Sequence, residues 1–254
     1  MRPIAATVVH NEPLVGRLSR LLLAAEPLRA ARPGQGIAIA EPGSRTILAH
    51  PYPIAAMDSG GTIGVIYSNQ HVLAPWLAAL PPGSALRMLG PWGRPFSRDA
   101  LARHAVLLGA GLRLLGLVAL ASALVEDGVA VVVLHDAPTA TDLVPPALLP
   151  AAAEYQVATA DGSAGIVGTA LDLLPPLLSW ADALYAALPA GAYISLRDRV
   201  HRHRLRPRRG FASVLAEAPL ACYAAACDGC AVSLRNGYRL LCKDGPAFDL
   251  LDVE

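Results

Sequence analysis

The four cysteines of this 254-residue chain all lie between Cys222 and Cys242. Their spacing is C-x4-C-x2-C-x11-C, so three thiols share one short loop and the fourth follows later. Thiolates are the ligands that iron–sulfur clusters and zinc prefer, and a C-x4-C-x2-C…C order is that of plant-type [2Fe–2S] sites. Small residues in the loop would let backbone amides approach the cluster. The pattern therefore predicts Cys222, Cys227, Cys230 and Cys242 as the ligands of a [2Fe–2S] cluster.

Zinc and disulfide bonds are the alternatives for this cysteine group. Structural zinc sites usually show two C-x2-C pairs, and here only Cys227 and Cys230 have that spacing. Disulfides would need an oxidising compartment, which nothing in the sequence indicates.

The rest of the composition describes a folded chain with little net charge. Hydrophobic residues make up 54% and charged residues 16%, and the formal net charge is +1. These values exclude a disordered chain, and they argue against a nucleic-acid-binding protein. The length favours two compact units.

Two patterns of secondary structure follow one another along the chain. The first hundred residues read as short strands separated by Pro-Gly turns, which is typical of a small antiparallel β-barrel. We expect these strands at residues 5–9, 36–40, 62–67 and 85–89. From residue 104 the pattern changes to a strand, a glycine turn, a helix over 112–126 and a strand over 129–134. This βαβ unit predicts a parallel sheet, with a further strand at 155–158 and a helix from about 169.

The apolar stretch 105–125 is long enough to raise the question of a membrane span. Arg113 lies near its middle and three glycines interrupt it, so we predict a βα unit and no membrane span. The N-terminus alternates like a strand and has no long apolar run, so we expect no signal peptide and a cytoplasmic location.

Four motifs together resemble a known family. They are P-G-Q at 33–35, L-G-P-W-G at 89–93, D-G-S-A-G-I-V-G at 161–168 and C-K-D-G-P-A-F at 242–248. With the order barrel, α/β unit and cysteine loop, the chain resembles the electron-transfer subunit of bacterial dihydroorotate dehydrogenase, in the ferredoxin-reductase superfamily.

The resemblance implies a fold, cofactors and a partner. The fold would be a flavin-binding antiparallel β-barrel over 1–101, a Rossmann-like α/β nucleotide domain over 102–212 and a small [2Fe–2S] module over 213–254. Such a subunit binds FAD and the cluster. It relays electrons between a partner catalytic dehydrogenase subunit, in pyrimidine biosynthesis, and a nicotinamide nucleotide such as NAD. The resemblance leaves open whether the chain is an enzyme by itself, because the partner subunit would carry out the chemistry on the substrate.

The flavin motif of that family, R-P-x-S, aligns with His50, Pro51, Tyr52 and Pro53. These four residues are therefore the predicted FAD contacts, with Tyr52 able to stack on the flavin ring. Pro53 offers no hydroxyl and no N–H, and His50 is a weaker partner for an anion than arginine at neutral pH.

The nucleotide loop of the family, G-G-G-x-G-x-A-P-L, aligns with residues 109–117. Gly109 and Gly111 remain as the predicted nucleotide contacts, whereas Arg113 replaces a glycine. The family's C-G-P motif reads Ala187-Leu188-Pro189, without its cysteine. These departures weaken the expectation of hydride exchange with NAD.

Two other functions remain open from the sequence. A ferredoxin–NAD(P) oxidoreductase or sulfide dehydrogenase subunit would share the architecture, and a non-catalytic iron–sulfur adaptor or sensor would explain the altered flavin and nucleotide motifs. Residues 197–209 hold seven arginines, which we interpret as a solvated helix face and linker; docking of an acidic partner is the alternative.

Overall fold

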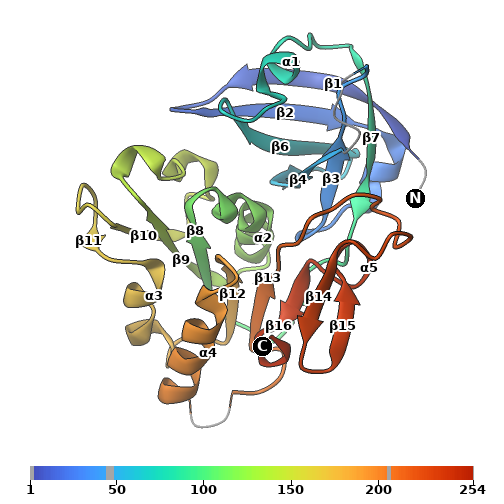
Figure 1. Cartoon of the computed structure of the whole chain (residues 1–254). Coiled ribbons are helices and arrows are strands. Elements are labelled where there is room, and N and C mark those ends of the chain that lie inside the picture. Colours follow the sequence, from blue (N-terminus) through green and yellow to red (C-terminus); the bar gives the residue numbers. More distant parts are fainter. Residues whose placement is uncertain (1–2, 44–48, 205–206, 254) are drawn as a thin grey trace.

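The computed structural model describes residues 3–43, 49–204 and 207–253. Two seven-stranded sheets dominate it, and a small hairpin at the C-terminal end lies beside them (Figure 1).

The N-terminal sheet is antiparallel throughout and curls so that β4, at one edge, contacts β6 near the other. Its strands are β1 (Ile4–Pro13), β2 (Leu18–Ala24), β3 (Gly36–Ile39), β4 (His50–Pro53), β5 (Ala56–Met57), β6 (Thr62–Ser68) and β7 (Ala85–Trp92), in the order β4-β3-β7-β1-β2-β6-β5. Helix α1 (Ala74–Ala78) follows β6. The predicted antiparallel barrel is confirmed as a fold.

Period-2 burial explains why these segments form strands. In β7 the side chains of Leu86 and Met88 point into the core, while Ala85 before them and Arg87 between them are exposed. The strands predicted at 5–9, 62–67 and 85–89 lie within β1, β6 and β7, and the one predicted at 36–40 ends one residue beyond β3. Sequence reasoning missed β2, whose run of leucines lacks a clear alternation.

The second sheet is parallel except for its last strand. Its order is β11-β10-β9-β8-β12-β13-β16, and β16 runs antiparallel to β13. The strands are β8 (His104–Ala110), β9 (Ala130–Ala137), β10 (Glu154–Thr159), β11 (Ile166–Val167), β12 (Ala183–Ala187), β13 (Ala212–Leu215) and β16 (Ala247–Asp249). The helices are α2 (Leu115–Glu126), α3 (Ala170–Leu173) and α4 (Ala192–His203). The predicted βαβ unit is confirmed by the parallel pairing of β8 with β9.

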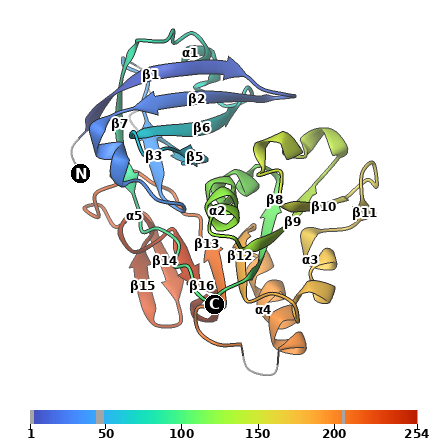
Figure 2. The same ribbon diagram turned by 180° about the vertical axis from the view of Figure 1, so that it is seen from behind.

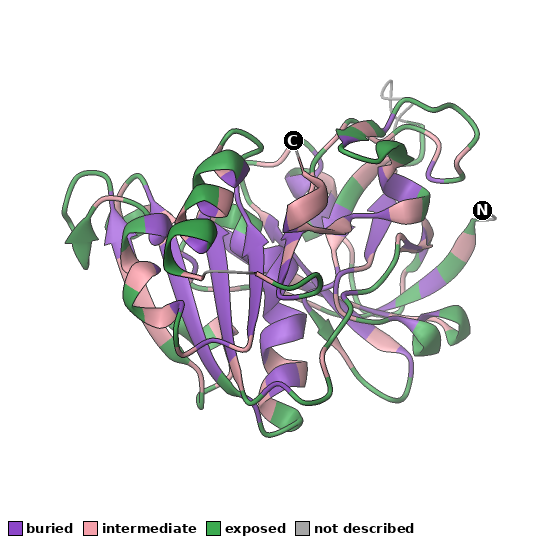
Figure 3. Ribbon diagram, turned by 90° about the horizontal axis from the view of Figure 1, so that it is seen from below, coloured by how far each residue is buried: buried purple, intermediate pink, exposed green. Residues whose placement is uncertain are grey.

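Helix α2 is buried on almost every side because it lies between the two sheets (Figure 2). Its leucines share one core with Leu18, Ala55 and Ile66 of the barrel. This location explains the long apolar stretch near residue 115, and the central strands beside it are buried along most of their length (Figure 3). No helix in the described part of the chain is long and apolar enough to cross a membrane.

The C-terminal segment leaves the second sheet and returns to it. After β13 come the cysteine loop, the hairpin β14 (Ala231–Leu234) and β15 (Gly237–Leu240), helix α5 (Leu241–Asp244) and finally β16. The sheet thus continues across residue 213, since β13 and β16 both belong to it. The domain limits 1–101, 102–212 and 213–254 stay a prediction.

The arginines near α4 mostly contact the chain itself. Arg199 pairs with Asp172, Arg208 with Asp99 and Arg209 with Asp252. The guanidinium of Arg204 lies 4.0 Å from the ring centre of Phe211, and it also donates to the Leu178 and Ala181 carbonyls. These contacts favour the interpretation as a helix face and linker.

Candidate cluster and flavin sites

The cysteine loop holds its backbone in an unusual conformation around Cys222. Tyr223, Ala225 and Asp228 have φ values of 53°, 54° and 52°, in the left-handed region that residues other than glycine rarely adopt. When the backbone alternates between right-handed and left-handed conformations, successive N–H groups point to one side and form a concave anion-binding site. Here the N–H groups of Ala224 and Ala226 lie 3.5 and 3.4 Å from Cys222 Sγ.

Electrostatics at the loop favour a thiolate at Cys222. The hydrogen bond from the Ala224 N–H is the largest cause, followed by that from Ala226, and together with Cys227 they lower the pKa of Cys222 to about 6. Burial instead raises the pKa of Cys242. A buried thiol becomes a metal-binding thiolate when a cation compensates its charge.

The four sulfur atoms form two pairs. Cys222 hydrogen-bonds Cys227, and Cys242 hydrogen-bonds Cys230. Cys230 and Cys242 are buried, Cys222 is half-buried and Cys227 is exposed. Among the described residues, no three His, Cys, Asp or Glu side chains converge in a way that would hold a single metal ion. A zinc ion would need four ligands around one point, whereas the four thiolates of a [2Fe–2S] cluster are shared between two irons.

Tyr223 anchors the cysteine loop to the barrel. Its side chain is only 1% exposed, and its hydroxyl donates to the Ala49 carbonyl at 2.8 Å. Its ring centre lies 5.7 Å from that of Trp92 at the end of β7. Tyr223 and Trp92 form one apolar cluster with Cys230 and Cys242.

Three of the sequence motifs meet beside this contact. The side-chain amide of Gln35, in P-G-Q, donates to the Gly93 carbonyl at 2.8 Å, in L-G-P-W-G. The Arg94 N–H donates to the Gly245 carbonyl of the C-K-D-G-P segment at 2.5 Å. Gly93 has a φ of 82°, and a Cβ there would lie 2.7 Å from Pro246 Cδ. The motifs therefore join the barrel to the C-terminal segment.

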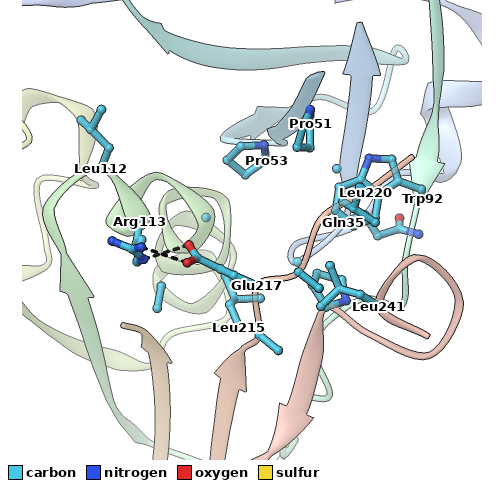
Figure 4. A pocket seen from close by; sticks show the side chains of 17 residues that line it. Gln35, Pro51, Pro53, Trp92, Leu112, Arg113, Leu215, Glu217, Leu220 and Leu241 are labelled. Atoms are coloured by element: carbon cyan, nitrogen blue, oxygen red, sulfur yellow. Dashed lines mark hydrogen bonds and ion pairs between the residues drawn. The ribbon is translucent and has the colours of Figure 1, made fainter. Parts of the chain in front are cut away.

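A pocket of about 460 Å³ opens where the barrel, the second sheet and the cysteine module meet (Figure 4). This volume is in the range of cofactor pockets. Its barrel wall consists of Gly34, Gln35, Gly36, Pro51, Pro53 and Trp92, and its other walls include Arg113, Gly116, Ala187, Glu217 and Leu241. A Cβ on Gly36 would lie 2.7 Å from Trp92 Cζ2, so glycine at this position leaves room for the indole ring beside β3.

The four predicted flavin residues alternate across β4. Pro51 and Pro53 line the pocket, whereas Tyr52 is buried in the barrel core. The Tyr52 hydroxyl lies 3.1 Å from His71 Nδ1, and the rings of His50 and His71 are 5.0 Å apart. A flavin in this pocket would therefore contact the prolines, with the Tyr52 ring on the opposite face of the strand.

The two predicted nucleotide glycines both have roles within the turn after β8. A Cβ on Gly109 would lie 2.6 Å from the Leu114 Cβ, and Gly111 has a φ of 52°. The Gly111 carbonyl accepts a hydrogen bond from Nε2 of the fully buried His135, at 3.0 Å. Burial lowers the pKa of His135 to about 4, so the ring is neutral and Nε2 carries its proton. Close packing thus accounts for Gly109, and the positive φ accounts for Gly111, without any bound nucleotide.

Arg113 turns toward the cysteine module. Its Nε lies 2.8 Å from Glu217 Oε1 and its second terminal nitrogen 2.9 Å from Glu217 Oε2 (Figure 4). Sequence reasoning missed Glu217 and the roles of Trp92 and Tyr223. Trp92 stands inside a recognised motif, but a lone acidic residue such as Glu217 carries no signal in one sequence.

Comparisons with known proteins agree with this arrangement. Residues 217–254 match the iron-sulfur cluster binding domain of dihydroorotate dehydrogenase B. The chain is 28% identical over 97% of its length to the dihydroorotate dehydrogenase B (NAD(+)) electron transfer subunit of Shouchella clausii, and covers 96% of that protein. The predicted family resemblance is confirmed. The corresponding subunit of Geobacillus thermodenitrificans is 29% identical, with 95% of each chain covered.

Solved structures show the ferredoxin-reductase-like fold. An NADH-dependent reduced ferredoxin-NADP oxidoreductase superposes with a TM-score of 0.81 at 20% identity, over 98% of this chain and 89% of that chain. The ferredoxin reductase of carbazole 1,9a-dioxygenase gives a TM-score of 0.67 at 21% identity, over 82% of this chain and 67% of that one. At such identities the likeness concerns the fold.

Proposed function

We propose that this chain is the electron-transfer subunit of a dihydroorotate dehydrogenase. It would carry FAD and a [2Fe–2S] cluster and pass electrons between a partner catalytic subunit, in pyrimidine biosynthesis, and a nicotinamide nucleotide or another acceptor. The observation that carries the proposal is the contact between Tyr223 of the cysteine loop and Trp92 of the pocket wall. It sets a cluster site directly beside a flavin-sized pocket.

The cysteine loop has the chemistry that a cluster needs. Cys222, Cys227, Cys230 and Cys242 supply four thiols in two pairs. The N–H groups at Ala224 and Ala226 stabilise negative charge on Cys222. The four thiols are free, which fits the reducing cytoplasm in which we place the protein.

The pocket has the shape and the unpaired donor that a flavin ring needs. Pro51, Pro53, Gly36 and Trp92 form a smooth apolar wall, and flat rings pack on such surfaces. The Trp92 Nε1 is buried with no hydrogen-bond partner in the described structure. A buried donor of this kind is costly, and the polar edge of a bound ring would supply the acceptor. FAD exchanges one or two electrons and the cluster one at a time, so the pair links a two-electron donor to a one-electron path.

Cofactor content tests this proposal. Protein purified without oxygen should be brown, with about two irons and two sulfides per chain, and its visible spectrum should also contain flavin bands. One zinc per chain in a colourless protein would overturn it. Mixing with a dihydroorotate dehydrogenase catalytic subunit should give a stable complex that reduces the cluster when dihydroorotate is added.

A non-catalytic iron–sulfur adaptor is the second candidate. The burial of Tyr52 away from the pocket and the presence of Arg113 in the nucleotide turn favour it. Cluster bands without flavin bands, even after incubation with excess FAD, would select the adaptor over the reductase.

A further inference from the structure

The ion pair between Arg113 and Glu217 stands where a nucleotide would be expected to bind. In open α/β sheets, ligands bind outside the carboxyl ends of the strands, at the point where the strand order reverses. Here the chain passes from β8 to β9 on one side, while β12 pairs with β8 on the other. Arg113 follows β8, and Ala187 ends β12; both line the pocket with Glu217.

We propose that Arg113 is the pyrophosphate-binding residue of a dinucleotide site, and that Glu217 occupies its guanidinium until a nucleotide displaces it. The inference rests on the proposed function, because it assigns the nucleotide site of the same subunit. In this site the charge of the Arg113 side chain would bind the pyrophosphate, in place of the backbone N–H groups of a glycine-rich loop.

The geometry of the pair suits an exchange of anions. Arg113 presents two nitrogens to the two Glu217 oxygens, at 2.8 and 2.9 Å. The same two-pronged geometry of guanidinium fits phosphate oxygens. A pyrophosphate carries more charge than one carboxylate, so it competes well for the guanidinium.

Because both side chains are exposed, Glu217 can be exchanged for a phosphate at a small cost in free energy. The side chain of Arg113 is 40% exposed and that of Glu217 51% exposed. Ion pairs this open contribute little to the stability of a fold. The pair can therefore open without unfolding the turn, which Gly109 and the His135–Gly111 hydrogen bond hold independently.

Glu217 also connects the nucleotide turn to the cysteine module. Glu217 lies in the linker 216–221, between β13 and Cys222. Its partner Arg113 lies in the turn that follows β8. The Glu217 carboxylate competes with phosphate for the Arg113 guanidinium. Arg113 is therefore the binding residue, and Glu217 lowers its affinity for phosphate.

Equilibrium binding of NAD⁺ to oxidised protein loaded with FAD and cluster tests the proposal. By calorimetry, Glu217→Gln should bind NAD⁺ about fivefold more tightly than the native protein, because Arg113 is freed. Arg113→Gln should bind about tenfold more weakly. The double variant should match Arg113→Gln, since Glu217 acts through Arg113. Inorganic pyrophosphate should compete with NAD⁺ in the native protein and in Glu217→Gln.

Arg98→Gln is the matched control. It breaks the Arg98–Asp127 ion pair, whose side chains are 38% and 57% exposed and lie away from this pocket, so the affinity for NAD⁺ should not change. Equal affinities in the native protein, Glu217→Gln and Arg113→Gln would overturn the inference. So would the absence of NAD⁺ binding in all of them. FAD and iron are measured in the same samples. A protein that keeps both cofactors, but whose affinity for NAD⁺ does not depend on Arg113, contradicts only this inference and not the proposed function.

Discussion

Trp92 and Tyr223 lie with their ring centres 5.7 Å apart, although they are far apart in the chain. Trp92 forms part of the pocket wall, and Tyr223 follows the first cysteine of the loop. The two rings are inclined by 55°. Offset and tilted aromatic pairs of this kind stabilise a contact beyond the area that they bury. The pair fixes the distance between the proposed flavin and cluster sites.

Replacing a cysteine tests the ligand set directly. Cys242→Ser and Cys222→Ser should each lose the cluster, because a serine hydroxyl is a poor ligand for iron at neutral pH. Iron and sulfide per chain, together with the visible absorption, measure the loss. Ala224→Ser, which adds a hydroxyl at an exposed position of the same loop, is the control. A Cys242→Ser protein with a full iron content would contradict the assignment.

Removing the Tyr223 hydroxyl tests how the cysteine loop docks on the barrel. Tyr223→Phe loses the hydrogen bond to Ala49 and leaves the Ala49 carbonyl oxygen without this donor. We expect the free energy of unfolding to fall by about 1 kcal/mol, with the cluster retained. Urea unfolding of the holoprotein measures the change.

Tyr238→Phe is the control for this variant. Tyr238 is 75% exposed, and its substitution should change the stability by less than about 0.5 kcal/mol. Equal stabilities of the two variants would show that the Tyr223 hydroxyl does not hold the loop.

His135 should make the stability of the protein depend on pH. Burial lowers the pKa of His135 to about 4, from 6.5 in the unfolded chain. Between these values the unfolded state binds the extra proton, so stability is complete above pH 6.5 and falls as the pH is lowered toward 4. Within this window the loss is at most about 1.4 kcal/mol per pH unit.

A glutamine at this position should flatten that dependence. Thermal unfolding of His135→Gln between pH 7 and pH 4.5 should show a smaller loss of stability than the native protein. His201→Gln, at an exposed position of α4, should keep the native profile. An unchanged slope in His135→Gln would mean that other groups cause the acid sensitivity.

Filling the space at Gly36 should disturb the proposed flavin wall. A Cβ at this position would lie 2.7 Å from the Trp92 ring and 2.9 Å from the Tyr52 carbonyl oxygen. Gly36→Ala should displace Trp92 and reduce the FAD retained after gel filtration several-fold, with the cluster still present. Gly191→Ala, which meets no atom within 4 Å, should retain FAD as the native protein does. Equal FAD retention in the two variants would remove Trp92 from the flavin site.

Periodicity in the sequence was sufficient for much of the fold. The continuous β-branched run of β9 was recognisable because a strand buried on both faces is apolar at successive positions. The pattern of β7 was recognisable because a strand buried on one face alternates between apolar and polar residues. Strand β12 was missed, since A-L-Y-A-A resembles a helical segment and becomes a strand only through its neighbours β8 and β13. The return of β16 to the sheet was also missed, because a three-residue strand has too little sequence to show a period.

The sequence by itself determined the cysteine spacing, the βαβ unit and the motifs that identified the family resemblance. These depend on residues close together in the chain, whose geometry is local. Only the tertiary structure decided which face of β4 lines the pocket, that Tyr223 packs on Trp92 and that Arg113 pairs with Glu217. Each of these depends on contacts between distant segments, which form only when the two sheets and the cysteine module pack together.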